Sequence, residues 1–178
     1  MIFRDGWPFL CSWSGGKDSC LSLYRAIEEG GRPRFLVTML AEGGERSRSH
    51  GLRIGVIEGQ SSALGIPLVT RATSWEDYET TFIAALRTLK KEGVEVGVFG
   101  DIDIDAHRDW VERACSSAGV RPRFPLWKAE RQVLLDQLLE AGFRATVISV
   151  REGALDSRLL GRPLDRATLR EIEAAGVD

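Results

Sequence analysis

Residues 9–31, FLCSWSGGKDSCLSLYRAIEEGG, contain the pattern that decides the fold. The short apolar run Phe9–Trp13 is typical of a buried strand, and it stops at the pair Gly15-Gly16. After these glycines, apolar side chains recur at helical spacing until Gly30-Gly31 ends the helix. The stretch therefore predicts a strand, a tight loop and a helix in succession.

The same alternation of strand and helix patterns continues along the chain. Near-continuous apolar runs such as Phe35–Leu40 indicate strands that are covered on both faces, as in a parallel sheet. Strands are expected near residues 35–40, 67–69, 94–99, 123–126 and 143–150, and helices over residues 51–64, 78–89, 105–118 and 130–141. We therefore predict an α/β fold in one domain, residues 1–178: a three-layer α/β/α sandwich with a mostly parallel, doubly wound sheet.

Composition and charge narrow the classes of function. A chain of 178 residues with 43% hydrophobic and 28% charged residues has the make-up of an ordinary globular protein with one core. The net charge of −2 lacks the basic excess on which nucleic-acid binding by charge depends, so no nucleic-acid partner is expected. A small molecule or a protein is the favoured substrate, and a homo-oligomer is left open.

The three cysteines, Cys11, Cys20 and Cys115, contain no C-x-x-C pair. An odd and unpaired set argues against a disulfide framework and against a zinc site, and it suits a reducing compartment. No apolar run approaches the ~20 residues needed to span a bilayer, so no membrane segment is expected. These features predict a cytoplasmic protein.

The loop Ser14–Ser19 has the chemistry of a phosphate site. It lies between a strand and a helix, where free backbone N–H groups and the helix dipole attract an anion. Glycine lets the backbone approach phosphate closely, the serine hydroxyls can donate hydrogen bonds, and Lys17 adds a positive charge. Asp18 suits a Mg²⁺ ion bound together with the phosphates. The candidate binding residues are Ser14, Gly15, Gly16, Lys17, Asp18 and Ser19.

This loop differs from the G-x-x-x-x-G-K-[ST] loop of phosphoryl-transfer enzymes. Cys11 stands in place of its first glycine and Asp18 in place of its Ser or Thr. A plain glycine turn with a helix cap is the structural alternative. The hexapeptide resembles the S-G-G-K-D-S signature of the PP-loop ATP pyrophosphatases, which adenylate a substrate and release pyrophosphate. The resemblance implies a Rossmann-like fold, ATP as cofactor, and AMP and pyrophosphate as products.

Further segments are similar to the diphthine–ammonia ligase family, and together they cover nearly the whole chain. They are Met39-Leu40, residues 45–51, 75–79 and 99–102, His107-Arg108, and residues 125–127 and 160–162. The resemblance implies that Met39, at the end of the second strand, contacts adenine through its backbone. It also implies that Gly100 and Asp101, at the end of the fourth strand, lie beside the nucleotide.

Other candidate residues have both a functional and a structural interpretation. Asp101, at the carboxyl edge of a sheet, suits Mg²⁺ or ribose, or it caps a helix. His107 and Arg108 can reach the α-phosphate or the substrate, or they are ordinary exposed side chains of a surface helix. We assign Lys17, Asp18, Asp101, His107 and Arg108 as candidate catalytic residues, and His50 and Trp127 as candidate substrate contacts.

The family resemblance implies an ATP-dependent amide ligase. A substrate carboxylate would attack the α-phosphorus, pyrophosphate would leave into the glycine loop, and ammonia would then displace AMP. Diphthine on an elongation factor is the implied substrate. Two alternatives remain: a bacterial paralogue that amidates a small metabolite, which an arginine-rich composition favours, and an adenine-nucleotide-binding module without catalysis.

The family pattern continues beyond residue 178 with a glycine- and glutamate-rich segment that lines the substrate site. We therefore expect residues 1–178 to contain the ATP half of the site and to lack that substrate segment. A chain of this length should bind ATP and handle its second substrate poorly.

Overall fold

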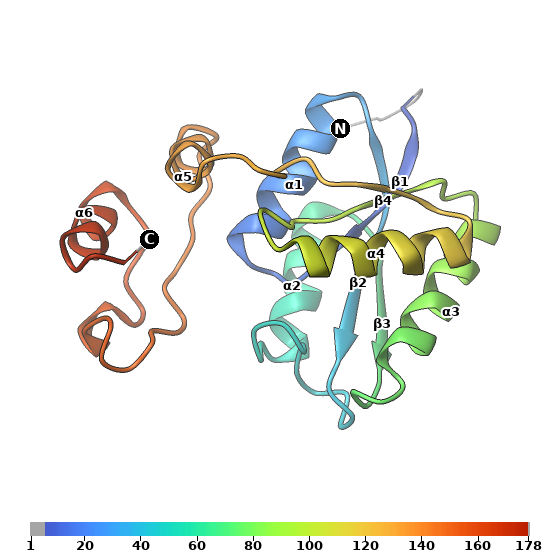
Figure 1. Ribbon diagram of the computed structural model, residues 1–178, viewed down its shortest axis with the longest axis horizontal. Coiled ribbons are helices and arrows are strands. Elements are labelled where there is room, and N and C mark those ends of the chain that lie inside the picture. Colours follow the sequence, from blue (N-terminus) through green and yellow to red (C-terminus); the bar gives the residue numbers. More distant parts are fainter. Residues whose placement is uncertain (1–5, 178) are drawn as a thin grey trace. The chain divides into compact units, whose positions relative to one another are not determined.

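The computed structural model describes residues 6–177, and its first 128 residues contain a five-stranded sheet (Figure 1). The strands are β1 (Pro8–Ser12), β2 (Arg32–Leu40), β3 (Leu68–Ala72), β4 (Val96–Val98) and β5 (Arg121–Arg123). Their order is β3-β2-β1-β4-β5, and every neighbouring pair is parallel. The predicted α/β fold with a parallel, doubly wound sheet is confirmed.

Helices cover both faces of this sheet. They are α1 (Lys17–Glu28), α2 (Ile54–Leu64), α3 (Tyr78–Lys91) and α4 (Asp105–Ala118). Alternate side chains of β1 point to opposite faces, so Phe9 and Cys11 join a core with α1 and α2, whereas Leu10 joins a core with α3 and α4. Cys115 of α4 is fully buried in the second of these cores. The three layers follow directly from this alternation.

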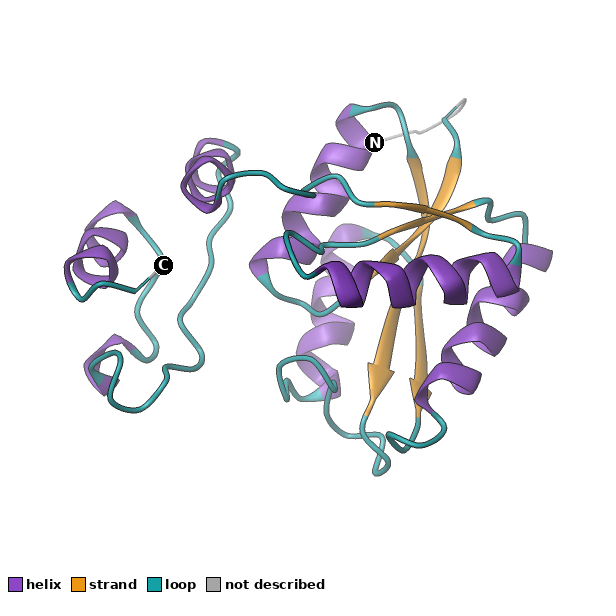
Figure 2. Cartoon of the chain, viewed as in Figure 1, coloured by secondary structure: helices purple, strands orange, loops and turns teal. Residues whose placement is uncertain are grey.

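Residues 1–178 are predicted to form one domain, whereas the chain divides between Lys128 and Ala129 into two compact units. The first unit contains the sheet. The second contains α5 (Arg131–Glu140), the short 3₁₀ helix η1 (Ser157–Leu159) and α6 (Arg166–Ala174), joined by loops (Figure 2). None of the helices within residues 6–177 has the length and apolarity required to cross a bilayer.

The predicted strand at residues 143–150 is wrong. Only an isolated antiparallel bridge joins Thr146 to Pro163, and the side chain of Ile148 is 53% exposed. Apolar residues form a strand only where a neighbouring strand accepts their backbone hydrogen bonds, and the described part of the second unit contains no strand. The last strand of the sheet, β5, also begins earlier than the predicted segment 123–126.

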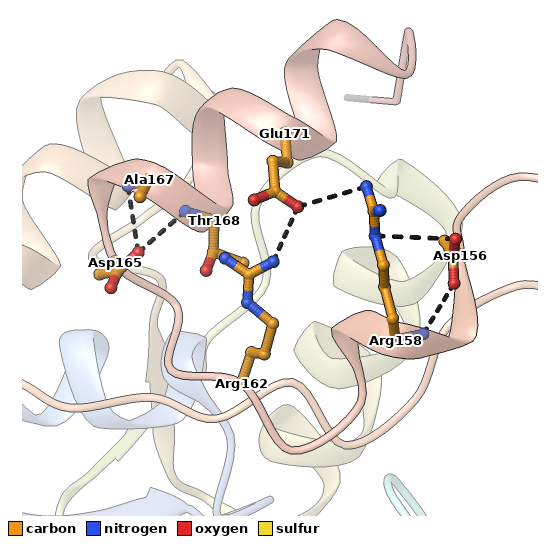
Figure 3. A network of polar contacts seen from close by, with 7 residues as sticks. All are labelled: Asp156, Arg158, Arg162, Asp165, Ala167, Thr168 and Glu171. Carbon is orange, nitrogen blue, oxygen red and sulfur yellow. Dashed lines mark hydrogen bonds and ion pairs between the residues drawn. The ribbon is translucent and has the colours of Figure 1, made fainter.

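Polar contacts organise the end of the second unit (Figure 3). Asp165 caps α6, because its Oδ1 accepts hydrogen bonds from the backbone N–H groups of Ala167, at 3.0 Å, and Thr168, at 2.8 Å. Arg162 donates to Glu171 at 2.7 Å. The hydrogen bond from Thr168 holds the pKa of Asp165 below its ordinary value, and the bond from Arg162 does the same for the pKa of Glu171.

Asp165→Ala is expected to lower the thermal unfolding temperature of the second unit, because it removes the cap of α6. The pKa of Asp165 is lowered in the folded state, so its contribution is present above the ordinary value of 3.8 and is lost as the pH falls through the folded pKa. Circular dichroism melts at neutral and acidic pH measure both effects. Asp165→Asn, which keeps a capping oxygen that does not titrate, is the control. Equal melting of Asp165→Ala and wild type at neutral pH would contradict the cap.

Candidate functional site

The order of the strands reverses direction at one position in the sheet, between β1 and β4. The chain proceeds outward from β1 through β2 to β3, and then crosses to β4 on the other side of β1. In such sheets a crevice lies outside the carboxyl ends of the two strands at the reversal, here β1 and β4. The loop Ser14–Ser19 follows β1, and Gly100 and Asp101 follow β4. Topology therefore brings the predicted phosphate loop and the predicted nucleotide residues to one edge.

The loop after β1 is closed by its own hydroxyl groups. The Ser14 hydroxyl accepts from the Gly16 N–H at 3.2 Å and donates to Ser19 Oγ at 3.1 Å. The Ser19 hydroxyl in turn donates to the Gly16 carbonyl at 2.9 Å. Gly15 has a φ of +77°, a left-handed conformation that favours glycine. These bonds fold the loop around the start of α1.

The start of α1 is open to an anion. Its N-cap is Gly16, and no side chain of the described residues caps the helix. The first N–H groups of a helix have no partner within the helix, and the helix dipole gives them partial positive charge. The N–H donors of the first turn of α1 therefore lie beyond the carboxyl end of β1, and phosphate binding there stays a prediction.

The side chains of Lys17 and Asp18 form an ion pair at the start of α1. The Lys17 ammonium lies 2.9 Å from both carboxylate oxygens of Asp18, and the two side chains are 41% and 37% exposed. No group of three metal-ligating side chains occurs among residues 6–177. The oxygen ligands of Asp18 suit Mg²⁺, but phosphate oxygens would have to complete the coordination shell.

His50 and Gly100 both pack onto this loop. The Nε2 of His50 would lie 2.6 Å from a β-carbon placed on Gly16, so the imidazole faces the N-cap of α1. A β-carbon on Gly100 would lie 3.0 Å from the backbone carbon and oxygen of Asp18. The loops after β2 and β4 thus contact the glycine loop. His50 lies beside the predicted phosphate site, whereas the sequence predicts it as a substrate contact.

Asp101 and His107 form a hydrogen-bonded pair. Oδ1 of Asp101 bonds to Nδ1 of His107, and the carboxylate is the less exposed partner, at 15% against 54% for the imidazole. The hydrogen bond that the Asp101 carboxylate accepts from the imidazole raises the pKa of His107, while partial burial opposes this change. The His107 ring stacks on Trp110, with ring centroids 5.7 Å apart. The pair can hold a proton and present Nε2 as a donor.

Asp101→Asn is expected to move the titration midpoint of His107 to lower pH, because the charge that favours the imidazolium is removed. Histidine proton resonances followed by NMR measure this midpoint. The pKa of His107 is raised in the folded state above 6.5, so the pair stabilises the fold below that pH and loses this contribution as the pH rises through the folded pKa. An unchanged His107 midpoint would contradict the pairing.

Arg108 and Trp127 contact each other. Nε of Arg108 donates to Glu112 at 2.7 Å, and its guanidinium lies 4.8 Å from the Trp127 ring centroid. Lys128 lies over the same ring, also at 4.8 Å. Within residues 6–177, no hydrogen bond or ion pair joins Arg108 to residues 14–19. Their predicted catalytic and substrate roles stay predictions.

Met39 lies where the resemblance places it, at the end of β2, and is 7% exposed. Its carbonyl accepts a hydrogen bond from the N–H of Arg48 at 3.0 Å. Arg48 also donates from Nε to the Thr73 carbonyl at 3.1 Å and stacks on Trp75, 4.4 Å from the ring centroid. Arg48 therefore orders the loop between β2 and α2. It lies in the family-like segment 45–51 but is not among the predicted site residues.

Gln60 is a second residue that the sequence does not reveal. It belongs to α2, yet its side chain bonds to the carbonyl of Gly15 at 3.1 Å and to the indole of Trp13 at 3.0 Å. Its separation from Gly15 is 45 residues, so no local pattern connects them. The only signal is its place on a helix that packs beside the first strand.

A parallel sheet with a glycine loop at its topological switch point is the arrangement of the PP-loop class of α/β proteins, and the fold places the chain in this class. The sequence profile of the diphthamide synthase N-terminal domain matches residues 9–122, and the chain belongs to this family. The predicted family resemblance is confirmed.

Individual relatives agree with this family. The chain is 29% identical to the diphthine–ammonia ligase of Bos taurus over 175 residues, which is 86% of this chain and 66% of the relative. The human diphthine–ammonia ligase gives the same identity and coverage. The chain thus spans slightly less than two thirds of these relatives. A predicted subunit of a tRNA methyltransferase from Methanocaldococcus jannaschii has a similar fold, with a TM-score of 0.50, 16% identity, and coverage of 75% and 76% of the two chains.

Proposed function

We propose that this protein activates a carboxylate with ATP and transfers it to ammonia, releasing pyrophosphate and AMP. The observation that supports the proposal most strongly is the open N-terminus of α1 inside the Ser14–Ser19 loop, in a chain of the diphthamide synthase family. A loop of backbone N–H donors at a switch point suits a multiply charged phosphate group. A cytoplasmic location is part of the proposal, and the three unpaired cysteines would suit a reducing compartment.

In this proposal, different residues bind different parts of the ATP molecule. The loop N–H groups and Lys17 hold the β- and γ-phosphates, and His50 lies close enough to the N-cap of α1 to donate to the same group. The edge of β2 at Met39 receives adenine. Mg²⁺ would be held by Asp18 and the phosphates, and it would supply positive charge near the leaving group.

The reaction has two bond exchanges. First, a carboxylate oxygen forms a bond to the α-phosphorus as the bond between the α-phosphorus and the bridging oxygen breaks. Pyrophosphate leaves with that oxygen, and Lys17 and the loop N–H groups offset its growing negative charge. Second, ammonia attacks the acyl carbon, the bond to AMP breaks, and a proton is lost from nitrogen. The Asp101–His107 pair lies after β4 and is our candidate for handling that proton.

The relatives named diphthine–ammonia ligase make diphthine the first substrate to test. A small metabolite, amidated by a bacterial paralogue, is the second. A binding module without turnover is the third, but the Lys17 and Asp18 pair at the loop mouth and the Asp101–His107 pair nearby suit chemistry better than passive binding.

Product analysis tests the proposal. The protein is incubated with ATP, Mg²⁺ and ammonium, with and without diphthine-containing elongation factor or small carboxylates, and the nucleotides are separated by chromatography. AMP and pyrophosphate in equal amounts, dependent on a carboxylate, are expected. ADP and phosphate as products would show phosphoryl transfer instead, and ATP binding without any cleavage would favour the binding module.

A further inference from the structure

Gln60 connects α2 to the glycine loop through two hydrogen bonds. Its side-chain oxygen accepts from the Trp13 indole N–H at 3.0 Å, and its side-chain nitrogen donates to the Gly15 carbonyl at 3.1 Å. The indole can only donate and the carbonyl can only accept, so one orientation of the amide satisfies both partners. The side chain is therefore fixed at both of its polar atoms.

Trp13 gives this bridge a rigid anchor. The residue is 3% exposed. Its backbone N–H donates to the Val37 carbonyl at 2.8 Å, and its own carbonyl accepts from the Thr38 hydroxyl at 2.6 Å. The backbone of Trp13 is thus hydrogen-bonded to β2, and its side chain is buried, so the indole offers Gln60 a donor in a fixed position.

The bond from Gln60 determines which way the next peptide group faces. A trans peptide is planar, and its C=O and N–H point in opposite directions. Since the Gly15 carbonyl is drawn toward α2, the Gly16 N–H must point away from α2, into the loop. There it meets the Ser14 hydroxyl at 3.2 Å, a long contact that a phosphate oxygen can replace.

Side chains of α2 pack closely against Gly15. A β-carbon on Gly15 would lie 2.7 Å from both Gln60 Oε1 and Ile57 Cδ1. The left-handed φ of +77° at Gly15 also favours glycine. The side of the loop that faces α2 is therefore filled, and the opposite side carries the N–H donors.

We propose that Gln60 is a positioning residue for the pyrophosphate leaving group: it fixes the peptide between Gly15 and Gly16 so that the Gly16 N–H faces the phosphates. This inference rests on the proposed ATP chemistry and adds a residue outside the loop to it. Gln60 touches the loop backbone and not the reacting atoms, so its effect is on affinity and on leaving-group stabilisation.

Gln60→Glu isolates the bond to Gly15. A carboxylate still accepts from Trp13, but it presents a second acceptor to the Gly15 carbonyl, and two acceptors repel each other. Calorimetry should show that the variant binds pyrophosphate and ATP at least about tenfold more weakly. This is the loss expected when the hydrogen bond from the Gly16 N–H to a charged phosphate is misplaced. Steady-state kinetics should show a higher KM for ATP together with a lower kcat.

Ser62→Glu is the matched control, because it adds the same charge at an exposed position of the same helix and should leave affinity unchanged. Gln60→Leu removes both bonds without adding charge, and it should weaken pyrophosphate binding in the same direction. Circular dichroism at the assay temperature verifies that each variant is folded, since a purely structural role would change melting but not the affinity of the folded protein.

The outcomes separate this inference from the function on which it rests. If wild type binds pyrophosphate and folded Gln60→Glu binds it equally well, the role of Gln60 is overturned and the proposed function stands. If wild type binds neither ATP nor pyrophosphate, both are overturned.

Discussion

Lys17→Ala is expected to lower the rate of pyrophosphate release from ATP by a factor of at least about 100 while leaving the fold intact. Lys17 supplies the positive charge of the glycine loop, and charge develops on the departing pyrophosphate. Its side chain is 41% exposed and pairs with Asp18 at the protein surface, so no core packing is lost. A coupled pyrophosphate assay measures the rate, and circular dichroism measures folding.

Two further variants make this result specific. Asp18→Ala should also abolish turnover, with a loss of the Mg²⁺ dependence of any residual rate. Lys90→Ala, at an exposed position of α3, removes an equal charge far along the chain from the loop and should leave the rate unchanged. Pyrophosphate release at the wild-type rate by Lys17→Ala would remove the loop lysine from the mechanism.

Gly100→Ala is expected to weaken ATP binding and to lower turnover by about 100-fold, because the added methyl group displaces the glycine loop. The β-carbon would lie 3.0 Å from the Asp18 carbonyl group and 3.1 Å from the Ser19 nitrogen. These are backbone atoms, which cannot rotate aside as the end of a long side chain can. The overpacking should also cost about 1–3 kcal/mol of unfolding free energy, which denaturant titration measures.

Gly59→Ala is the matched control for this substitution. Gly59 lies in α2, and a β-carbon added there would meet no atom of a neighbouring segment within 4 Å. Alanine favours a helix over glycine by about 1 kcal/mol, so this variant should be more stable and equally active. Full activity of Gly100→Ala would contradict this prediction, because it would show that a displaced Ser14–Ser19 loop still binds ATP.

The parts of the fold that depend on short-range patterns were predictable from the sequence. The helix predicted at residues 105–118 has those bounds in the structure, because its apolar positions recur at helical spacing and Gly119 ends it in a left-handed conformation with φ of 70°. The strand predicted at residues 9–13 is found at Pro8–Ser12. The glycine loop that follows this strand depends on the same local rules.

Features that depend on contacts between distant segments were not predictable. The apolar segment 143–150 has the composition of a strand, but composition does not show whether a neighbouring strand is present. In the sequence Gln60 looks like an ordinary helix residue, because its contact with the loop exists only once α2 packs beside that loop. His50 illustrates the same limit, because isolated bridges between Leu40 and Ser47 and between Arg46 and Arg53 fold its loop back toward Gly16.

The buried cysteines give the two helical layers separate chemical reporters. Cys11 of β1 lies in the core beneath α1 and α2, and Cys115 of α4 lies in the core on the other face. Burial raises the pKa of each thiol to about 12, so neither forms the thiolate that reacts with alkylating reagents. Each can therefore be labelled only when its own layer opens. Labelling rates resolved by mass spectrometry would compare the opening equilibria of the two sides of the sheet, and nucleotide should slow the labelling of Cys11 the more strongly.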